Sequence, residues 1–126
     1  VVTMMALGRG AEEEILRLEE LIPELDYLSI SAAECRALRG HACKEAAKKL
    51  GRMVRGWAVV HRPGGSWSSD GRRLFETKVE EASGVIVGAG DAFAAALIHF
   101  GLRGFAIEAM VARAHEWATN SLVLQA

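Results

Sequence analysis

The chain has 126 residues, of which 51% are hydrophobic and 25% are charged, and it contains only two prolines. This composition excludes a disordered or fibrous protein and is typical of a globular domain with its own core. The formal net charge of −1 comes from 15 basic and 16 acidic residues, so no overall field attracts nucleic acid or an acidic membrane surface. No apolar run approaches the roughly 20 residues of a membrane-spanning helix. We therefore expect neither nucleic acid nor a membrane among its partners.

The two cysteines, Cys35 and Cys43, lack the paired spacing of a zinc site and are too few for a disulfide framework. We interpret both as small apolar residues. The chain also opens without the charged and apolar segments of a secretion signal. We therefore expect a cytoplasmic protein.

Both ends of the chain lie inside predicted elements. The apolar run over residues 1–6 predicts a buried strand that begins without a leader. Residues 122–126 still belong to a helical apolar pattern and lack a capping glycine. We expect the chain to be one piece of a larger protein.

Predicted helices and strands alternate along the first half of the chain. Residues 12–22 have an acidic start and apolar residues at helical spacing, and Pro23 closes this helix. Residues 27–30 are short and apolar, which predicts a second strand. Ser31 is then expected to cap a short helix that ends at Gly40.

A longer amphipathic helix is predicted over residues 43–54, with its lysines on the exposed face, and a third strand over residues 57–60. Asp70 and Gly71 follow one another between two runs of strand-forming residues. An Asp-Gly pair in this position is the strongest short-range signal for a β-hairpin. The middle of the chain therefore combines a helix, a strand and a hairpin.

The last third of the chain contains one more strand and two helices. Residues 85–87 predict a strand, and residues 92–100 predict a helix that Gly101 ends. A final helix begins near Phe105 and has one apolar stripe, to which Trp117 belongs. Strands that alternate with helices indicate an α/β fold, with a mostly parallel sheet flanked by helices and an additional β-hairpin.

Residues 88–91 form a Gly-Ala-Gly-Asp turn between the predicted strand and helix. The glycines allow backbone N–H groups to approach a ligand, and the start of a helix favours an anion. Asp91 makes chemical sense there if it takes a proton from a substrate hydroxyl while the amides neutralise a transferred phosphoryl group. The alternative is that Asp91 only caps the helix and that the glycines only permit a tight turn.

Residues 88–93, Gly-Ala-Gly-Asp-Ala-Phe, resemble the second signature of the ribokinase-like (phosphofructokinase B type) carbohydrate kinases. Residues 21–28 are similar to the leucine, leucine, proline, x, x, aspartate segment that approaches a strand in that family. Residues 31–34 are similar to its Asn-x-x-Glu motif. The resemblance extends over residues 12–126 in the order and spacing of the family.

The resemblance implies ATP-dependent phosphorylation of a hydroxyl on a small-molecule sugar or nucleoside, with Mg²⁺ as the metal ion. Asp91 is then the catalytic base, and Gly88, Ala89 and Gly90 form the anion hole. The chain would be a carbohydrate or nucleoside kinase, and a homodimer is a further candidate assembly.

The resemblance also indicates where a nucleotide and a metal ion would bind. The family's glycine-bearing loop corresponds to residues 62–65, in which Gly64 and Gly65 would contact the nucleotide. His115 lies near a position that is often asparagine on the adenine side, although a packed or surface histidine is the alternative. Glu34 keeps a carboxylate that could reach magnesium through a water molecule. A helix-capping or solvated carboxylate is the alternative for Glu34.

The chain departs from the family pattern at several positions. Ser31 stands in place of an asparagine, and Pro63 in place of an early glycine of the nucleotide loop. Residues 85–87 lack the Asp-Thr pair that supports a monovalent-cation site, so we expect no potassium activation. Arg62 could meet a phosphate or remain solvated, and His99 is interpreted as structural because no second ligand lies at metal spacing.

Family members have a further N-terminal half that supplies the contacts to the sugar. We therefore expect residues 1–126 to be a single partial domain, the C-terminal nucleotide-binding and catalytic part of a ribokinase-like fold. The alternative is a truncated, non-catalytic remnant of the same fold that only binds a nucleotide or has a structural role.

Overall fold

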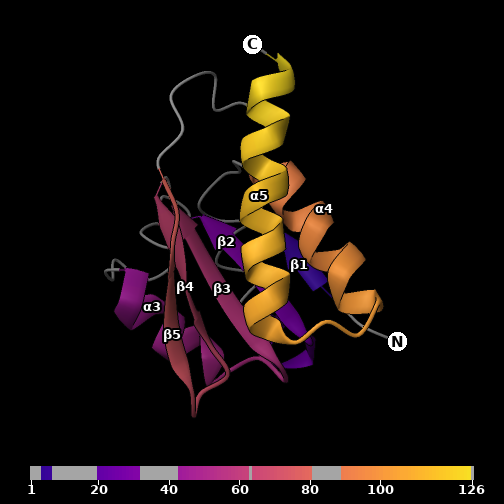
Figure 1. The fold of residues 1–126 in the computed structure, drawn as a ribbon. Coiled ribbons are helices and arrows are strands. Elements are labelled where there is room, and N and C mark those ends of the chain that lie inside the picture. The colour runs from indigo at the N-terminus through magenta and orange to yellow at the C-terminus, as the bar shows by residue number, and fades with distance from the viewer. Residues whose placement is uncertain (1–3, 7–19, 32–42, 63, 81–88, 126) are drawn as a thin grey trace. The chain divides into compact units, whose positions relative to one another are not determined.

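The computed structural model describes residues 4–6, 20–31, 43–62, 64–80 and 89–125 (Figure 1). The chain forms two compact units. The first comprises Val1–Arg62 and Ser66–Glu76, and the second comprises Pro63–Gly65 and Thr77–Ala126. In the described part, no helix is long and apolar enough to cross a membrane.

Within the described ranges, five strands form one sheet in the order β1-β2-β3-β4-β5. Their bounds are Met4–Ala6 for β1, Tyr27–Ser31 for β2, Trp57–Arg62 for β3, Gly65–Ser69 for β4 and Leu74–Lys78 for β5. β1, β2 and β3 run parallel, with Leu28 of β2 beside Met5 of β1 and Ala58 of β3. The predicted strands over residues 27–30 and 57–60 are therefore confirmed, as is the α/β fold.

The sheet is parallel only up to β3. β4 begins three positions after β3 ends, and β5 begins five positions after β4 ends. Links this short join antiparallel neighbours, because a parallel crossover needs a dozen or more residues. The second link is the predicted hairpin, in which the Asp70 N–H donates to the Arg73 carbonyl at 3.3 Å. The Oδ1 of Asp70 also accepts hydrogen bonds from the N–H groups of Arg72 and Arg73, at 2.9 and 2.7 Å.

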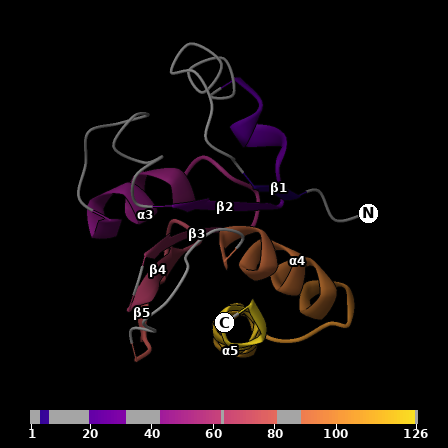
Figure 2. The same cartoon turned by 90° about the horizontal axis from the view of Figure 1, so that it is seen from above.

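Helix α3, Cys43–Gly51, packs along the sheet and closes the core of the first unit (Figure 2). Its apolar face is buried, while Lys44 and Lys49 on the other face are exposed. Alternate residues of β2 and β3 face this helix because side chains on a strand point to opposite faces in turn. The core residues of the strands and of the helix are Leu28, Ile30, Ala58, Val60, Ala46, Ala47 and Leu50.

Pro23 lies inside a short 3-10 helix, Ile22–Glu24. A proline costs nothing in the first turn, since the N–H that it lacks has no partner there. The predicted helix over residues 12–22 lies mostly outside the described residues. The helix expected from Ser31 to Gly40 and the strand over residues 85–87 also lie outside them.

Two helices make up most of the second unit, and they pack against each other. They are α4, Ala89–Leu102, and α5, Ile107–Gln125. The prediction that Gly101 ends α4 is wrong. The helix continues one residue further, to Leu102. Gly101 lies beside the side chain of Met110 of α5, where a Cβ would come within 3.0 Å of the Met110 Cε.

The end of α4 is instead made at Gly104, which has a φ of 79°. The N–H of Phe105 donates to the carbonyl of Phe100, and the N–H of Gly104 to that of Gly101, both at 3.1 Å. The Phe100 and Phe105 rings also lie 5.0 Å apart. These two hydrogen bonds and the apolar contact define a Schellman motif, which satisfies carbonyls that the last turn leaves unpaired.

We predict that Asp70→Ala lowers the free energy of unfolding at pH 7 by about 1 kcal/mol, because two N–H groups lose their acceptor. The hydrogen bonds from Arg73 and Arg72 lower the pKa of Asp70 below its ordinary 3.8. The stabilisation is therefore present above pH 3.8 and is lost as the pH falls through the folded-state pKa.

Urea unfolding of the wild type and of this mutant at a series of pH values measures the difference. Asp70→Asn is the matched control, because its amide oxygen still accepts a hydrogen bond but does not titrate. Equal stability of Asp70→Ala and the wild type at pH 7 would contradict the prediction.

We also predict opposite effects of alanine at two glycines. At Gly56 a Cβ would overlap the backbone carbonyl of Asp26, so Gly56→Ala is expected to cost about 1–3 kcal/mol of stability. At Gly101 the nearest atom is the flexible end of Met110, and alanine is the better helix former by up to about 1 kcal/mol. Gly101→Ala should therefore be neutral or stabilising. Thermal melts that ranked the two mutants the other way would show that this steric account is wrong.

Candidate functional site

Helix α4 begins at Ala89, so the predicted anion hole coincides with the start of a helix. Ala89, Gly90 and Asp91 are its first three residues, whereas Gly88 lies outside the described residues. The N–H groups of a first helical turn have no acceptor within the helix and point toward the solvent or a ligand. The amides of Ala89 and Gly90 therefore have no acceptor within the helix, and Asp91 lies in the same turn. The anion hole itself stays a prediction.

Apolar side chains hold α4 and α5 together. Phe93 and Leu97 are one helical turn apart on α4 and are each 2% exposed. On α5, Met110, Val111 and Ala114 are buried to the same degree. Because residues three and four apart share a helical face, each helix buries one stripe. The apolar stripe that the sequence predicts on the last helix is confirmed for these residues.

His115 is buried, with only 6% of its surface exposed, and its ring lies 4.7 Å from the ring of Phe93. Burial disfavours the charged imidazolium and lowers the pKa of His115 from 6.5 to about 4. His115 is therefore neutral near pH 7. The sequence suggested either a nucleotide contact or a packed histidine. The structure places His115 in packing contact with Phe93 of α4, which lies two residues after Asp91.

An aromatic cluster lies on the same helix pair. The rings of His99 and Trp117 stack at 5.9 Å with an interplanar angle of 30°, and Phe100 lies within 6.0 Å of both. Trp117 is 50% exposed, so it is not buried with the rest of the apolar stripe to which the sequence assigns it. It lies at the edge of the buried stripe, where its indole packs on neighbouring rings instead of filling the interior. His99 is itself exposed and has a packing role, as expected.

Gly64 and Gly65 both have positive φ values, 91° and 149°. A Cβ on Gly65 would overlap the carbonyl oxygen of Thr77, so the neighbouring strand requires a glycine there. The N–H of Val79 also donates to the carbonyl of Gly64 at 3.0 Å. These glycines thus have a structural reason of their own, and their contact with a nucleotide stays a prediction.

The arginine before this loop has a defined partner. Arg62 Nη2 lies 3.4 Å from a carboxylate oxygen of Glu76 on β5. The two side chains are 42% and 21% exposed, so the ion pair is partly solvated and weak. Arg62 therefore pairs with a carboxylate, which neither of the sequence-based alternatives included.

Two polar residues that the sequence did not single out together lie side by side at the carboxyl ends of parallel strands. Ser31 of β2 and His61 of β3 are partners in the register. Ligands of open α/β sheets bind outside this edge. The only sequence signal was that each residue is polar at the end of an apolar run, and pairing required the strand register.

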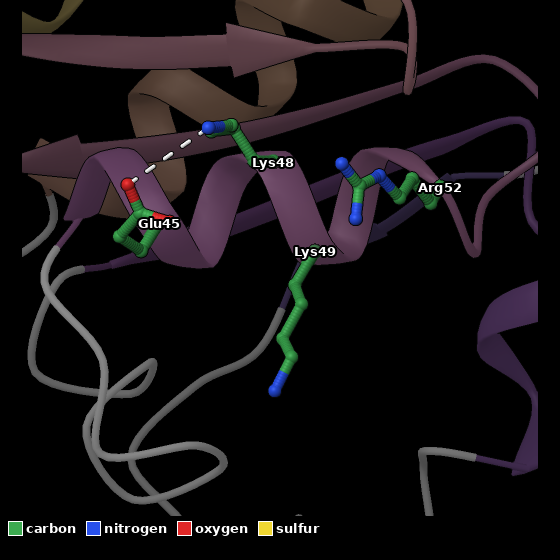
Figure 3. A pocket seen from close by; sticks show the side chains of 4 residues that line it. All are labelled: Glu45, Lys48, Lys49 and Arg52. Atoms are coloured by element: carbon green, nitrogen blue, oxygen red, sulfur yellow. Dashed lines mark ion pairs between the residues drawn. The ribbon is translucent and has the colours of Figure 1, made fainter.

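A pocket of about 200 Å³ lies on the exposed face of α3 (Figure 3). Glu45, Lys48, Lys49 and Arg52 line it. Lys48 points toward Glu45, with 4.0 Å between their charged atoms, whereas Lys49 points away from this pair. These residues are the solvated face of the predicted amphipathic helix, and none of them belongs to the predicted site.

The predicted metal contact is not among the residues that the structure describes. Glu34 lies outside them. Within the described ranges, no group of three histidine, cysteine, aspartate or glutamate side chains could hold a metal ion. Mg²⁺ commonly binds through only one or two carboxylates together with substrate phosphates, so a protein cage of three ligands is not required.

Comparison with known families identifies the chain. The pfkB family of carbohydrate kinases matches residues 9–125, which is nearly the whole sequence. The chain belongs to this family. The resemblance found in the Gly-Ala-Gly-Asp turn therefore reflects a relationship that extends over both compact units of this pfkB-family chain.

Solved structures of ribokinase-family kinases share the fold. Adenosine kinase of Anopheles gambiae, in complex with P1,P4-di(adenosine-5) tetraphosphate, matches with a TM-score of 0.80 and 18% identity. A putative ribokinase II of E. coli, in complex with ATP and Mg²⁺, matches at 0.72 and 20%. A pyrophosphate-dependent kinase, in complex with a pyrophosphate analogue and myo-inositol, matches at 0.72 and 19%. The expected ribokinase-like fold is thereby confirmed.

These matches cover 96%, 87% and 83% of the pfkB-family chain. They cover only 42%, 39% and 39% of the three larger proteins, so this chain spans about two fifths of their length. A search of the curated proteins finds no significant match.

The buried His115 should make the stability of the pfkB-family chain depend on pH. Because folding lowers its pKa, His115 adds no proton-linked cost to folding well above pH 6.5. Stability should fall as the pH drops from 6.5 toward about 4, where the unfolded chain binds a proton that the folded chain does not. His115→Phe should remove this part of the pH dependence in thermal melts. NMR titration of His115 with a midpoint near 6.5 would show instead that the ring is solvated.

Proposed function

We propose that the chain carries out the phosphoryl-transfer half of a small-molecule kinase reaction, the ATP-dependent phosphorylation of a hydroxyl on a sugar or nucleoside. The observation that carries this proposal is the start of α4 at Ala89, within the Gly-Ala-Gly-Asp sequence of a pfkB-family chain. It combines amides without an intrahelical acceptor and a carboxylate in one turn.

The chemistry requires a base and an anion site together. Asp91 would take the proton of the acceptor hydroxyl as the hydroxyl oxygen attacks the terminal phosphorus of the donor. The bond between that phosphorus and the leaving phosphate oxygen breaks, and the leaving group departs with the bonding electrons. The amides of Gly88, Ala89 and Gly90 would stabilise the charge on the transferred phosphoryl group.

Ser31 and His61 lie side by side at the carboxyl edge of the parallel strands, and hydroxyl and imidazole groups can donate hydrogen bonds to phosphate oxygens. Gly64 and Gly65 are the candidate nucleotide contacts, as the family loop implies. The proposed donor is ATP, although one structurally similar enzyme is a pyrophosphate-dependent kinase.

The proposal includes Mg²⁺ as the ion that neutralises the donor phosphates when it is bound. The donor type fits, because Glu34 and the phosphates themselves offer oxygen ligands, which this cation prefers. This chain's own residues would then hold the phosphoryl group at the start of α4 and place Asp91 beside the acceptor. The acceptor would be a small-molecule sugar or nucleoside, and a homodimer and a cytoplasmic location remain part of the proposal.

The alternative is a non-catalytic remnant that binds a nucleotide or has a structural role. It is favoured by the span of about two fifths of the similar kinases. Ser31 and Pro63, which replace the usual asparagine and glycine of the family, also favour it. The two functions differ in whether the chain transfers a phosphoryl group or only binds its donor.

We predict that Asp91→Asn lowers turnover by about 10²- to 10⁴-fold, the usual contribution of a general base. Donor affinity should change by only a few-fold, because asparagine keeps the size of the side chain and the phosphate-binding amides belong to the backbone. Phosphoryl transfer to a panel of sugars and nucleosides, followed by ³¹P NMR with ATP and Mg²⁺, measures turnover. Calorimetry measures donor affinity.

A thermal melt of the mutant is the control for folding. Full activity of a stably folded Asp91→Asn would restrict Asp91 to capping the helix. No transfer to any acceptor by the wild-type chain, together with measurable donor binding, would favour the non-catalytic alternative.

A further inference from the structure

The position of the first turn of α4 depends on Phe93. In an α-helix the N–H of each residue donates to the carbonyl four residues earlier, so Phe93 lies one turn after Ala89, the first residue of α4. Its side chain is 2% exposed. Among the described residues, Phe93 is thus the first buried side chain of α4. It anchors the helix directly after the amides of Ala89 and Gly90 and the backbone of Asp91.

His115 contacts this anchor from the neighbouring helix. The centres of the two rings are 4.7 Å apart and their planes are inclined by 54°, a tilted arrangement that aromatic pairs favour. Both residues are buried, so the contact is held by packing on each side. α4 and α5 pack against each other closely, which leaves the first turn of α4 tied to α5 through this ring pair.

The burial of His115 argues against a role as a cationic phosphate ligand. A ring that is 6% exposed has little surface with which to meet a ligand. Its pKa of about 4 keeps it uncharged near pH 7, so it cannot supply a positive charge to a phosphate. Its ring lies against the aromatic ring of Phe93.

We propose that His115 is a positioning residue, which holds the phosphate-binding first turn of α4 in place through its ring contact with Phe93. This inference rests on the proposed function of that turn. It replaces the nucleotide contact suggested by the sequence, since His115 acts here through the shape of an aromatic ring rather than through a hydrogen bond to adenine.

Two substitutions at His115 separate these roles. His115→Phe keeps an aromatic ring against Phe93 and removes both ring nitrogens. His115→Asn keeps a polar side chain that can hydrogen-bond to a nucleotide and removes the ring. A positioning role predicts that phenylalanine preserves binding and asparagine weakens it, whereas a nucleotide contact predicts the reverse.

The binding experiment uses the full chain with two probes, pyrophosphate and ATP. An aromatic pair contributes about 0.5–1.5 kcal/mol, so His115→Asn should weaken both ligands by about 2- to 12-fold and by equal factors. His115→Phe should bind both as the wild type does. A loss confined to ATP in His115→Phe would overturn the proposal, because pyrophosphate has no adenine.

NMR provides a readout that does not depend on binding. In the free protein, the amide signals of Ala89, Gly90 and Asp91 should move in His115→Asn and stay close to their wild-type positions in His115→Phe. Phe93→Leu should move the same signals, and the double mutant with His115→Asn should show less than the sum of the two changes. Unmoved first-turn amides in a folded His115→Asn would overturn the proposal.

These measurements keep the two hypotheses apart. If the wild-type chain binds neither pyrophosphate nor ATP, the proposed function fails, while the amide signals still decide the role of His115. If the wild type binds both ligands and His115→Asn binds each of them with wild-type affinity, the positioning role fails and the proposed function stands. A thermal melt of each variant confirms that the comparison is made on folded protein.

Discussion

A helix leaves the N–H groups of its first turn without partners of its own, and the proposed chemistry depends on where α4 places those groups. They belong to Ala89, Gly90 and Asp91. Small residues leave these amides open to a ligand, and the third residue supplies a carboxylate. The turn alone has little to hold it, because its residues are small or polar. Phe93 and His115 therefore matter, since their buried ring contact is what ties this turn to α5.

The first unit is organised by a different constraint, the register of parallel strands. Leu28 and Ile30 face α3, so their neighbours on β2 must face the other way. The same alternation applies on β3, and the register then sets Ser31 beside His61. Polar residues thus meet at the carboxyl edge without disturbing the core on the other face.

Patterns of neighbouring residues predicted much of this fold. Periodicity predicts the exposed face of α3, on which Lys44 and Lys49 lie, and turn chemistry predicts the hairpin at Asp70. Both signals act over only a few residues. The predictions were less accurate in the second unit. Gly101 stays helical because the helix-ending hydrogen bonds form at Gly104 and Phe105 instead, and Trp117 is half exposed although it belongs to the apolar stripe of α5.

The sequence by itself determined the family and the residues of the candidate turn, because Gly-Ala-Gly-Asp-Ala-Phe is a contiguous pattern that needs no spatial information. It could not determine what His115 contacts. A histidine on a helix has the same sequence context whether its side chain contacts a ligand or another helix. The packing of α4 on α5 decided what His115 contacts. Burial next to Phe93 keeps the imidazole uncharged near pH 7 and places its ring in the contact on which the proposed positioning role rests.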